Sequence, residues 1–145
     1  MKIILFLCTG NYYRSRFAEY LFNAVATERS ISWRANSRGL ALERGVNNIG
    51  PISKYATEGL AQRGIILSDR LRDPISAKKV DFTSSDKIIA LDDREHRPLM
   101  TLKFPQWVEK IEYWNVSDID RTSPQQALQT IEQNIRQQIE LLPEF

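Results

Sequence analysis

A strand-to-helix transition in residues 5–19 constrains the fold of this chain more than any other part of the sequence. A short apolar run over residues 3–7 is typical of a buried β-strand, and an amphipathic helical pattern begins at Ser15. The polar residues between them must form a tight loop, and this loop holds Cys8, the single cysteine of the chain. Backbone N–H groups of such a loop, together with those that begin the helix, form a site for an anion of the size of phosphate.

The side chains of this loop suit nucleophilic chemistry at a phosphate. Positive partial charge at the start of the helix, with Arg14 nearby, favours the thiolate of Cys8, which is the nucleophilic form. Arg14 can present a planar pair of N–H groups to two phosphoryl oxygens. Gly10 permits a close backbone approach, and Asn11 tolerates a left-handed conformation. Ser15 is expected to cap the helix and to stabilise the thiolate with its hydroxyl. A lone cysteine after a strand is by default a small core residue, but this combination favours a phosphate loop.

The loop resembles that of the low-molecular-weight protein tyrosine phosphatases, whose first strand ends in Cys-x-Gly-Asn-x-Cys-Arg-Ser before a helix that opens with Pro-x-Ala-Glu. Residues 8–19 here read Cys-Thr-Gly-Asn-Tyr-Tyr-Arg-Ser-Arg-Phe-Ala-Glu. Tyr13 replaces the second cysteine of the family, and Arg16 replaces its proline. The resemblance implies that Cys8 and Arg14 are catalytic. It also implies a set of phosphate-binding and supporting residues in the same loop: Thr9, Gly10, Asn11, Tyr12, Tyr13 and Ser15.

Length, charge and cysteine count limit the functions that remain. The 145 residues suit one domain, residues 1–145, with a substantial apolar core. A net charge of +2 and a pI of about 8.8 give no indication of a nucleic-acid or membrane partner. No apolar run is long enough to cross a bilayer, and the first strand is too short for a signal peptide. With one cysteine the chain forms no internal disulfide and no zinc site of the cysteine type, so we expect a cytoplasmic location. We also expect a monomer, and we expect no metal or cofactor because Arg14 and the loop supply the positive charge.

The rest of the chain alternates between strand and helix patterns. Further strands are expected at residues 31–35, 87–92 and 111–114. Helices are expected at residues 15–28, from Pro51 to Gly64, from a cap at Asp92 or Asp93 to about residue 100, and after Ser123 and Pro124. This alternation predicts an α/β fold with a parallel sheet covered on both faces. The resemblance implies a three-layer, Rossmann-like or flavodoxin-like domain with four strands in the order 2-1-3-4.

Two segments are expected to border the active site. Residues 37–39 resemble a family loop beside the phosphate, although Arg38 stands where the family has alanine. Arg38 is expected to face solvent, and the alternative is that it adds positive charge near the phosphate. Residues 40–50 correspond to one wall of the substrate cleft, and they lack the aromatic residue that the family usually has there.

Three other positions receive mostly structural interpretations. The charged residues 70–73 match a basic stretch of the family, and we expect them to be solvated and to have no role in the site. Asp92 is either a helix cap or a support for the active site, because the family has an aspartate at the end of this strand. His96, the single histidine, is expected on an exposed helix surface without a catalytic role.

A general acid must protonate the leaving oxygen, and a carboxylic acid on a loop above the cleft can do so. The family has this acid in a Trp-x-Val-x-Asp-Pro segment after the last strand. The corresponding residues 114–119 read Trp-Asn-Val-Ser-Asp-Ile, which places Asp118 at the acid position with Ile119 in place of proline. Asp120 is the second candidate, and an ordinary loop role for both acids is the alternative.

Three functions fit this pattern. The first is a cysteine-dependent protein tyrosine phosphatase that forms a phosphocysteine, or a related enzyme for phosphoarginine or another small phosphomonoester. The second, an arsenate reductase, usually relays a disulfide through further cysteines, so only a form that uses an external thiol fits a chain with Cys8 alone. The third is a weakly active module that binds phosphate or a similar oxyanion in the loop. Tyr12 is larger than the usual family residue and could stack on an aromatic substrate or block deep entry.

Overall fold

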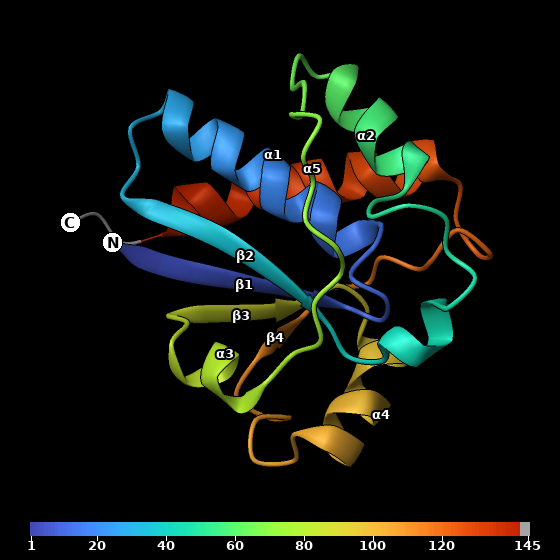
Figure 1. The fold of residues 1–145 in the computed structure, drawn as a ribbon. Helices are drawn as coiled ribbons and strands as arrows, with labels where there is room; N and C mark the ends of the chain where they lie inside the picture. Colours follow the sequence, from blue (N-terminus) through green and yellow to red (C-terminus); the bar gives the residue numbers. More distant parts are fainter. Residues whose placement is uncertain (143–145) are drawn as a thin grey trace.

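Four parallel strands form one sheet in the order β2-β1-β3-β4 (Figure 1). The structure, a computed structural model, describes residues 1–142. The strands are β1 (Lys2–Cys8), β2 (Trp33–Gly39), β3 (Lys87–Ala90) and β4 (Glu112–Tyr113). The predicted parallel sheet and its strand order are confirmed. The predicted end of the domain at residue 145 lies outside the described residues.

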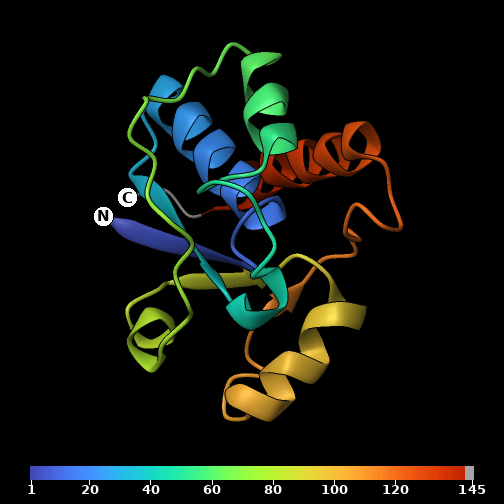
Figure 2. The same ribbon diagram turned by 45° about the vertical axis from the view of Figure 1, so that its right-hand side comes forward.

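Helices cover both faces of this sheet, as the alternating pattern predicted (Figures 1 and 2). One face carries α1 (Arg14–Glu28), α2 (Lys54–Ala61) and α5 (Pro124–Leu141). The other face carries α3 (Lys79–Thr83) and α4 (Asp93–Lys103), and a short 3₁₀ helix, η1 (Leu42–Gly45), follows β2. Among residues 1–142, no helix is long and apolar enough to cross a membrane.

The central strand β1 is buried on both faces, which explains its continuous apolar run. Ile4 and Phe6 belong to the core under α1 and α5, whereas Leu5 and Leu7 belong to the core on the α4 side. All four side chains are at most 1% exposed. The apolar residues of β1 therefore join the two layers of helices.

The register of the strands brings several loops to one edge of the sheet. Cys8 at the end of β1 lies opposite Gly39 at the end of β2, and Leu7 lies opposite Ala90 at the end of β3. The loops that follow these strands therefore meet at the carboxyl edge. In open α/β sheets this is the edge where ligands bind.

Several element boundaries differ from the sequence prediction. β2 extends to Gly39, four residues beyond the predicted end, because residues 36–39 pair with β1 and Gly39 also bridges Ser76. α2 begins at Lys54 rather than at Pro51, because the hydroxyl of Ser53 caps the helix by accepting from the Tyr55 N–H. The predicted start of α5 after Ser123 is confirmed, since its hydroxyl accepts from the Gln126 N–H.

Candidate active site

The loop between β1 and α1 places the thiol of Cys8 beside the hydroxyl of Ser15. Cys8 is 2% exposed, and its Sγ lies 2.9 Å from Ser15 Oγ. The sequence predicted this contact. The prediction that Ser15 caps the helix was wrong, because α1 begins at Arg14 and Tyr13 occupies the N-cap position. The Ser15 hydroxyl faces Cys8 and Asn11 instead of capping the helix.

Asn11 fixes the shape of this loop. Its φ of 50° is left-handed, as the sequence predicted, and its side chain is fully buried. The amide Nδ2 donates to Ser15 Oγ and to Ser37 Oγ, both at 2.9 Å. The amide Oδ1 accepts from Arg72 and from the Ile75 N–H. The buried amide is thus hydrogen-bonded at both ends, which stabilises a conformation that most residues avoid.

Arg72 contacts the phosphate loop, so its predicted place on a solvated surface was wrong. Its guanidinium donates to Asn11 Oδ1 at 2.9 Å, to Glu19 Oε1 at 2.9 Å and to Ser37 Oγ at 2.9 Å. The segment around residue 75 runs beside β2, where Gly39 N–H donates to Ile75 O, and this pairing brings Arg72 against the loop. Burial lowers the pKa of Arg72, and the adjacent Glu19 carboxylate opposes this effect.

Arg16, which stands where the family has proline, is another buried support. It is fully buried and donates to the carbonyls of Pro51 at 2.8 Å and Arg72 at 2.9 Å. It also donates to the Tyr20 hydroxyl at 3.0 Å. Arg16 therefore ties the segments around residues 51 and 72 to α1. No pattern in the sequence indicated these contacts.

Arg14 lies inside the site with carboxylates on two sides. It is 2% exposed, and its Nη1 donates to Val116 O at 2.9 Å. Its Nη2 lies 2.7 Å from Glu95 Oε2 and 3.7 Å from Asp118 Oδ2. Burial alone would lower the pKa of Arg14, but the hydrogen bond to Glu95 and the charges of Cys8, Glu95 and Asp118 together raise it. The guanidinium therefore stays cationic.

His96 lies beneath the loop, so its predicted exposure was wrong. The side chain is fully buried because it shares a face of α4 with Leu99 and Met100. Its Nε2 lies 3.1 Å from Thr9 Oγ1 and 3.2 Å from Glu95 Oε2. Burial lowers the pKa of His96, although the hydrogen bond to Glu95 opposes this effect. Burial by itself raises the pKa of Glu95, but its hydrogen bonds from His96, Arg14 and Thr9 and the charge of Arg14 lower it overall.

Asp92 and Arg38 also differ from their predicted surroundings. Asp92 precedes α4, but its side chain makes no capping hydrogen bond, and its backbone N–H donates to His96 Nδ1 at 3.0 Å. Arg38 does not face open solvent. Its side chain is 16% exposed and its Nε lies 3.3 Å from Asp81 Oδ1 in α3, because the segment that leads into α3 pairs with Gly39 at the end of β2.

The predicted catalytic side chains meet in a cavity of about 670 Å³. Cys8, Arg14 and Asp118 all line it, whereas Asp120 is exposed and is not among its lining residues. Of the predicted phosphate-binding residues, Gly10, Tyr12 and Tyr13 also line the cavity. The remaining ones support it through contacts already described: Thr9, Asn11 and Ser15.

Aromatic and aliphatic side chains form the walls of this cavity. Residues 40–50 contribute no aromatic ring, as the sequence showed, but Tyr55 of α2 lines the cavity together with Tyr12. The Tyr12 hydroxyl donates to Ile49 O at 2.6 Å, which fastens the loop after β2 to the phosphate loop. Burial, followed by the charge of Asp118, raises the pKa of Tyr13 to about 12, so this phenol stays protonated.

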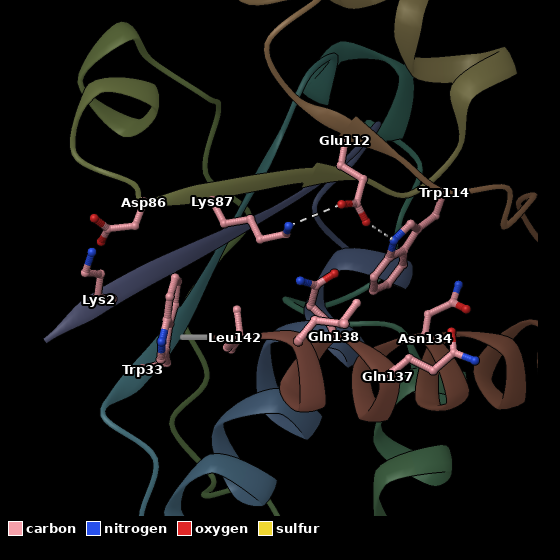
Figure 3. A pocket seen from close by; sticks show the side chains of 11 residues that line it. Lys2, Trp33, Asp86, Lys87, Glu112, Trp114, Asn134, Gln137, Gln138 and Leu142 are labelled. Carbon is pink, nitrogen blue, oxygen red and sulfur yellow. Dashed lines mark hydrogen bonds and ion pairs between the residues drawn. The ribbon is translucent and has the colours of Figure 1, made fainter. Parts of the chain in front are cut away.

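A second cavity of about 460 Å³ lies at the opposite end of the sheet, between the starts of the strands and α5 (Figure 3). Two of its charged groups form an ion pair, and a tryptophan binds the same carboxylate. Lys87 Nζ lies 3.3 Å from Glu112 Oε1, and Trp114 Nε1 donates to Glu112 Oε2 at 2.8 Å. None of the residues of the phosphate loop lines this second cavity.

Comparisons with known proteins agree with this geometry. A family model described as "Low molecular weight phosphotyrosine protein phosphatase" matches residues 3–144. The chain therefore belongs to this family, whose members are cysteine-dependent phosphatases.

Individual relatives are more distant. A Homo sapiens low molecular weight phosphotyrosine protein phosphatase is 32% identical over 100 residues, which cover 68% of this chain and 60% of that protein. A Bacillus subtilis protein-arginine-phosphatase is 26% identical over 108 residues, which cover 74% of this chain and 67% of that protein. Among solved structures, a low molecular weight protein tyrosine phosphatase from T. tengcongensis has a TM-score of 0.81 and 25% identity, covering 98% of this chain and 100% of its own. Vibrio vulnificus Wzb in complex with benzylphosphonate, at 18% identity, has the same fold with a TM-score of 0.80 over 97% of this chain and 99% of its own.

Proposed function

We propose that this protein is a metal-independent, cysteine-dependent protein tyrosine phosphatase that forms a phosphocysteine intermediate. One observation carries the proposal: Cys8, Arg14 and Asp118 line the same cavity although 110 residues separate the first from the last. A nucleophile, a fixed cation and a carboxyl group are the three parts that this reaction needs.

In the first step the Cys8 thiolate attacks phosphorus and the bond to the phenolic oxygen breaks. The Ser15 hydroxyl, 2.9 Å from the sulfur, stabilises the thiolate by donating a hydrogen bond. Arg14 and the N–H groups of the loop bind the equatorial oxygens of the phosphoryl group. Asp118, near Arg14 at the mouth of the cavity, gives its proton to the leaving oxygen.

In the second step water hydrolyses the phosphocysteine. Asp118 is now a carboxylate and takes a proton from the attacking water as the oxygen bonds to phosphorus. The sulfur–phosphorus bond breaks, which returns the Cys8 thiolate and releases inorganic phosphate. The carboxyl group thus acts as acid in one step and as base in the next.

The cavity walls favour an aromatic substrate. Tyr12 and Tyr55 offer rings against which a phenyl group packs, and Ile49 and Ile52 add aliphatic surface. Phosphoarginine carries a guanidinium group that needs acidic partners, and Asp118 is the one carboxylate among the described lining residues. We therefore place phosphotyrosine first. The Bacillus subtilis relative named as a protein-arginine-phosphatase keeps phosphoarginine as the alternative substrate.

A phosphate-release assay over three substrates tests this function. An aryl phosphate, a phosphotyrosine peptide and a phosphoarginine peptide are supplied with a metal chelator, and the Cys8→Ser variant serves as the blank. We expect the phosphotyrosine peptide to have the highest kcat/KM and the variant to release no phosphate above background. Full activity in Cys8→Ser contradicts the mechanism, whereas a preference for phosphoarginine changes only the substrate.

We infer the cellular setting from charge and composition as part of the same proposal. The net charge of +2 and the single cysteine fit a cytoplasmic monomer without nucleic-acid or membrane partners. Its partners are then phosphorylated proteins or small phosphomonoesters, and the reaction requires no cofactor because Arg14 and the loop supply the positive charge.

A further inference from the structure

The first turn of α4 brings one carboxylate oxygen to three groups of the active site. Glu95 Oε2 accepts from Arg14 Nη2 at 2.7 Å and from the Thr9 hydroxyl, and it lies 3.2 Å from His96 Nε2. Thr9 belongs to the phosphate loop and Arg14 begins α1, so this single oxygen connects α4 to both. No sequence pattern indicated a role for Glu95, because more than 80 residues separate it from its partners in the loop.

Glu95 holds Arg14 without lining the cavity itself. Arg14 lines the cavity, whereas Glu95 and Val116 are not among the described lining residues. Val116 O accepts from Nη1 and Glu95 accepts from Nη2, so these two bonds fix both ends of the guanidinium. A guanidinium carries five N–H donors, so these two bonds leave three of them for other partners. The two bonds therefore orient Arg14 and still leave donors for a bound phosphate.

His96 in turn orients Glu95. Its Nδ1 accepts from the Asp92 backbone N–H at 3.0 Å, so the proton of the neutral ring resides on Nε2. Nε2 faces Glu95 Oε2 and Thr9 Oγ1. Glu95 Oε2 is thus surrounded by three donors: Arg14 Nη2, the Thr9 hydroxyl and His96 Nε2. A glutamine oxygen at the same position could accept from the same three groups.

We propose that Glu95 is a positioning residue for Arg14 and that it acts through the length of its side chain rather than through its charge. The proposal rests on the proposed function of Arg14 in phosphate binding. It assigns Glu95 no contact with the substrate. A side chain of the same length without charge then keeps Arg14 in place, and a shorter side chain with full charge does not.

Two substitutions separate the effect of side-chain length from the effect of charge. Glu95→Gln keeps the length and removes the charge, whereas Glu95→Asp keeps the charge and withdraws the oxygen by about one carbon–carbon bond. Asp93→Asn is the matched control, because Asp93 lies in the same turn of α4 and pairs with Arg97 instead of the loop. Steady-state kinetics with an aryl phosphate gives kcat and KM, and calorimetry gives the affinity for inorganic phosphate. Circular dichroism checks that each variant is folded.

We expect Glu95→Asp to lower kcat/KM and phosphate affinity more than tenfold, and Glu95→Gln to remain within about fivefold of the wild type. Asp93→Asn should match the wild type. The proposal is overturned if Glu95→Asp has the kcat/KM and phosphate affinity of the wild type, or if the two variants lose equal factors in both quantities. It is also overturned if Glu95→Gln loses more than Glu95→Asp. Absence of Cys8-dependent phosphate release in the wild type would count against the proposed function instead, and the phosphate affinities would still decide the role of Glu95.

Discussion

The two ends of the sheet carry cavities with opposite chemistry. In the cavity near the amino ends of the strands, the Glu112 carboxylate forms an ion pair with Lys87 and accepts a hydrogen bond from Trp114 (Figure 3). At the carboxyl ends, Arg14 donates to Val116 O and Glu95 Oε2 and also lines the cavity, as Cys8 does. The difference indicates what makes a cavity a candidate site: a charged group that the fold fixes in place beside a nucleophile. Volume alone does not separate the two cavities.

This comparison predicts that substitutions at the carboxyl end change the chemistry, and that those at the amino end do not. The largest effect after loss of Cys8 is expected for Asp118→Asn. Loss of the proton donor should lower kcat about 10²- to 10⁴-fold on a phosphate ester with a poor leaving group. An ester of an acidic phenol needs little protonation, so its first step should change much less.

The measurement compares kcat of both esters in wild type and Asp118→Asn. Asp120→Asn is the control, since Asp120 is exposed and does not line the cavity. Equal rates of wild type and Asp118→Asn on both esters would remove Asp118 from the mechanism. A loss confined to Asp120→Asn would assign the acid to the neighbouring position.

A smaller effect is expected for Arg72→Met, which acts on the support of the loop. Methionine removes the donors to Asn11, Glu19 and Ser37, and it leaves the mostly buried Glu19 carboxylate without its cationic partner. We expect kcat to fall about tenfold to a hundredfold because Asn11 no longer holds the loop rigidly. The free energy of unfolding should fall by about 2 kcal/mol.

Kinetics and urea unfolding check this prediction. Arg70→Met is a matched control, because Arg70 is exposed and its substitution removes the same charge two residues away. If Arg70→Met and Arg72→Met behave alike, the hydrogen bonds of Arg72 do not support the loop.

His96 predicts a pH dependence of stability. Burial lowers the pKa of His96 in the folded state. As pH falls below about 6.5, His96 therefore binds a proton more readily in the unfolded chain than in the folded protein. The free energy of unfolding must then fall as pH decreases from 7.5 to 5.0. This one group contributes at most about 2 kcal/mol to that decrease.

Urea unfolding of wild type and His96→Asn at the two pH values isolates this contribution. Other titrating groups are common to both proteins, so the wild type should lose more stability than the variant. An equal loss in the two proteins would mean that His96 accepts its proton as readily in the folded state as in the unfolded state.

The sequence predicted the local part of the site and missed the long-range part, for physical reasons. The contact of Cys8 with Ser15 and the conformation of Asn11 depend on residues within one loop, where spacing and backbone preference are informative. Arg72 and Glu95 reach the loop from segments more than 60 residues away, and no periodic pattern marks them.

His96 is different, because a signal existed. It precedes Leu99 and Met100 by three and four residues, which is the spacing of one helical face, and both are buried. The apolar stripe of α4 therefore indicated a buried histidine. The fold was more predictable than the site for the same reason: alternation of strands and helices is written along the chain, whereas side-chain convergence is not.

The smallest effect is expected at the amino end, for Glu112→Gln. The side chains of Lys87 and Glu112 are 32% and 40% exposed, so loss of their ion pair should change the free energy of unfolding by less than about 1 kcal/mol. We expect kcat and KM to stay within twofold of the wild type. Glu112 nevertheless lies in β4, which leads directly to Val116, whose carbonyl accepts from Arg14. A tenfold loss of kcat in a stably folded Glu112→Gln would therefore mean that β4 transmits changes from one cavity to the other, and that the two ends of the sheet are not independent.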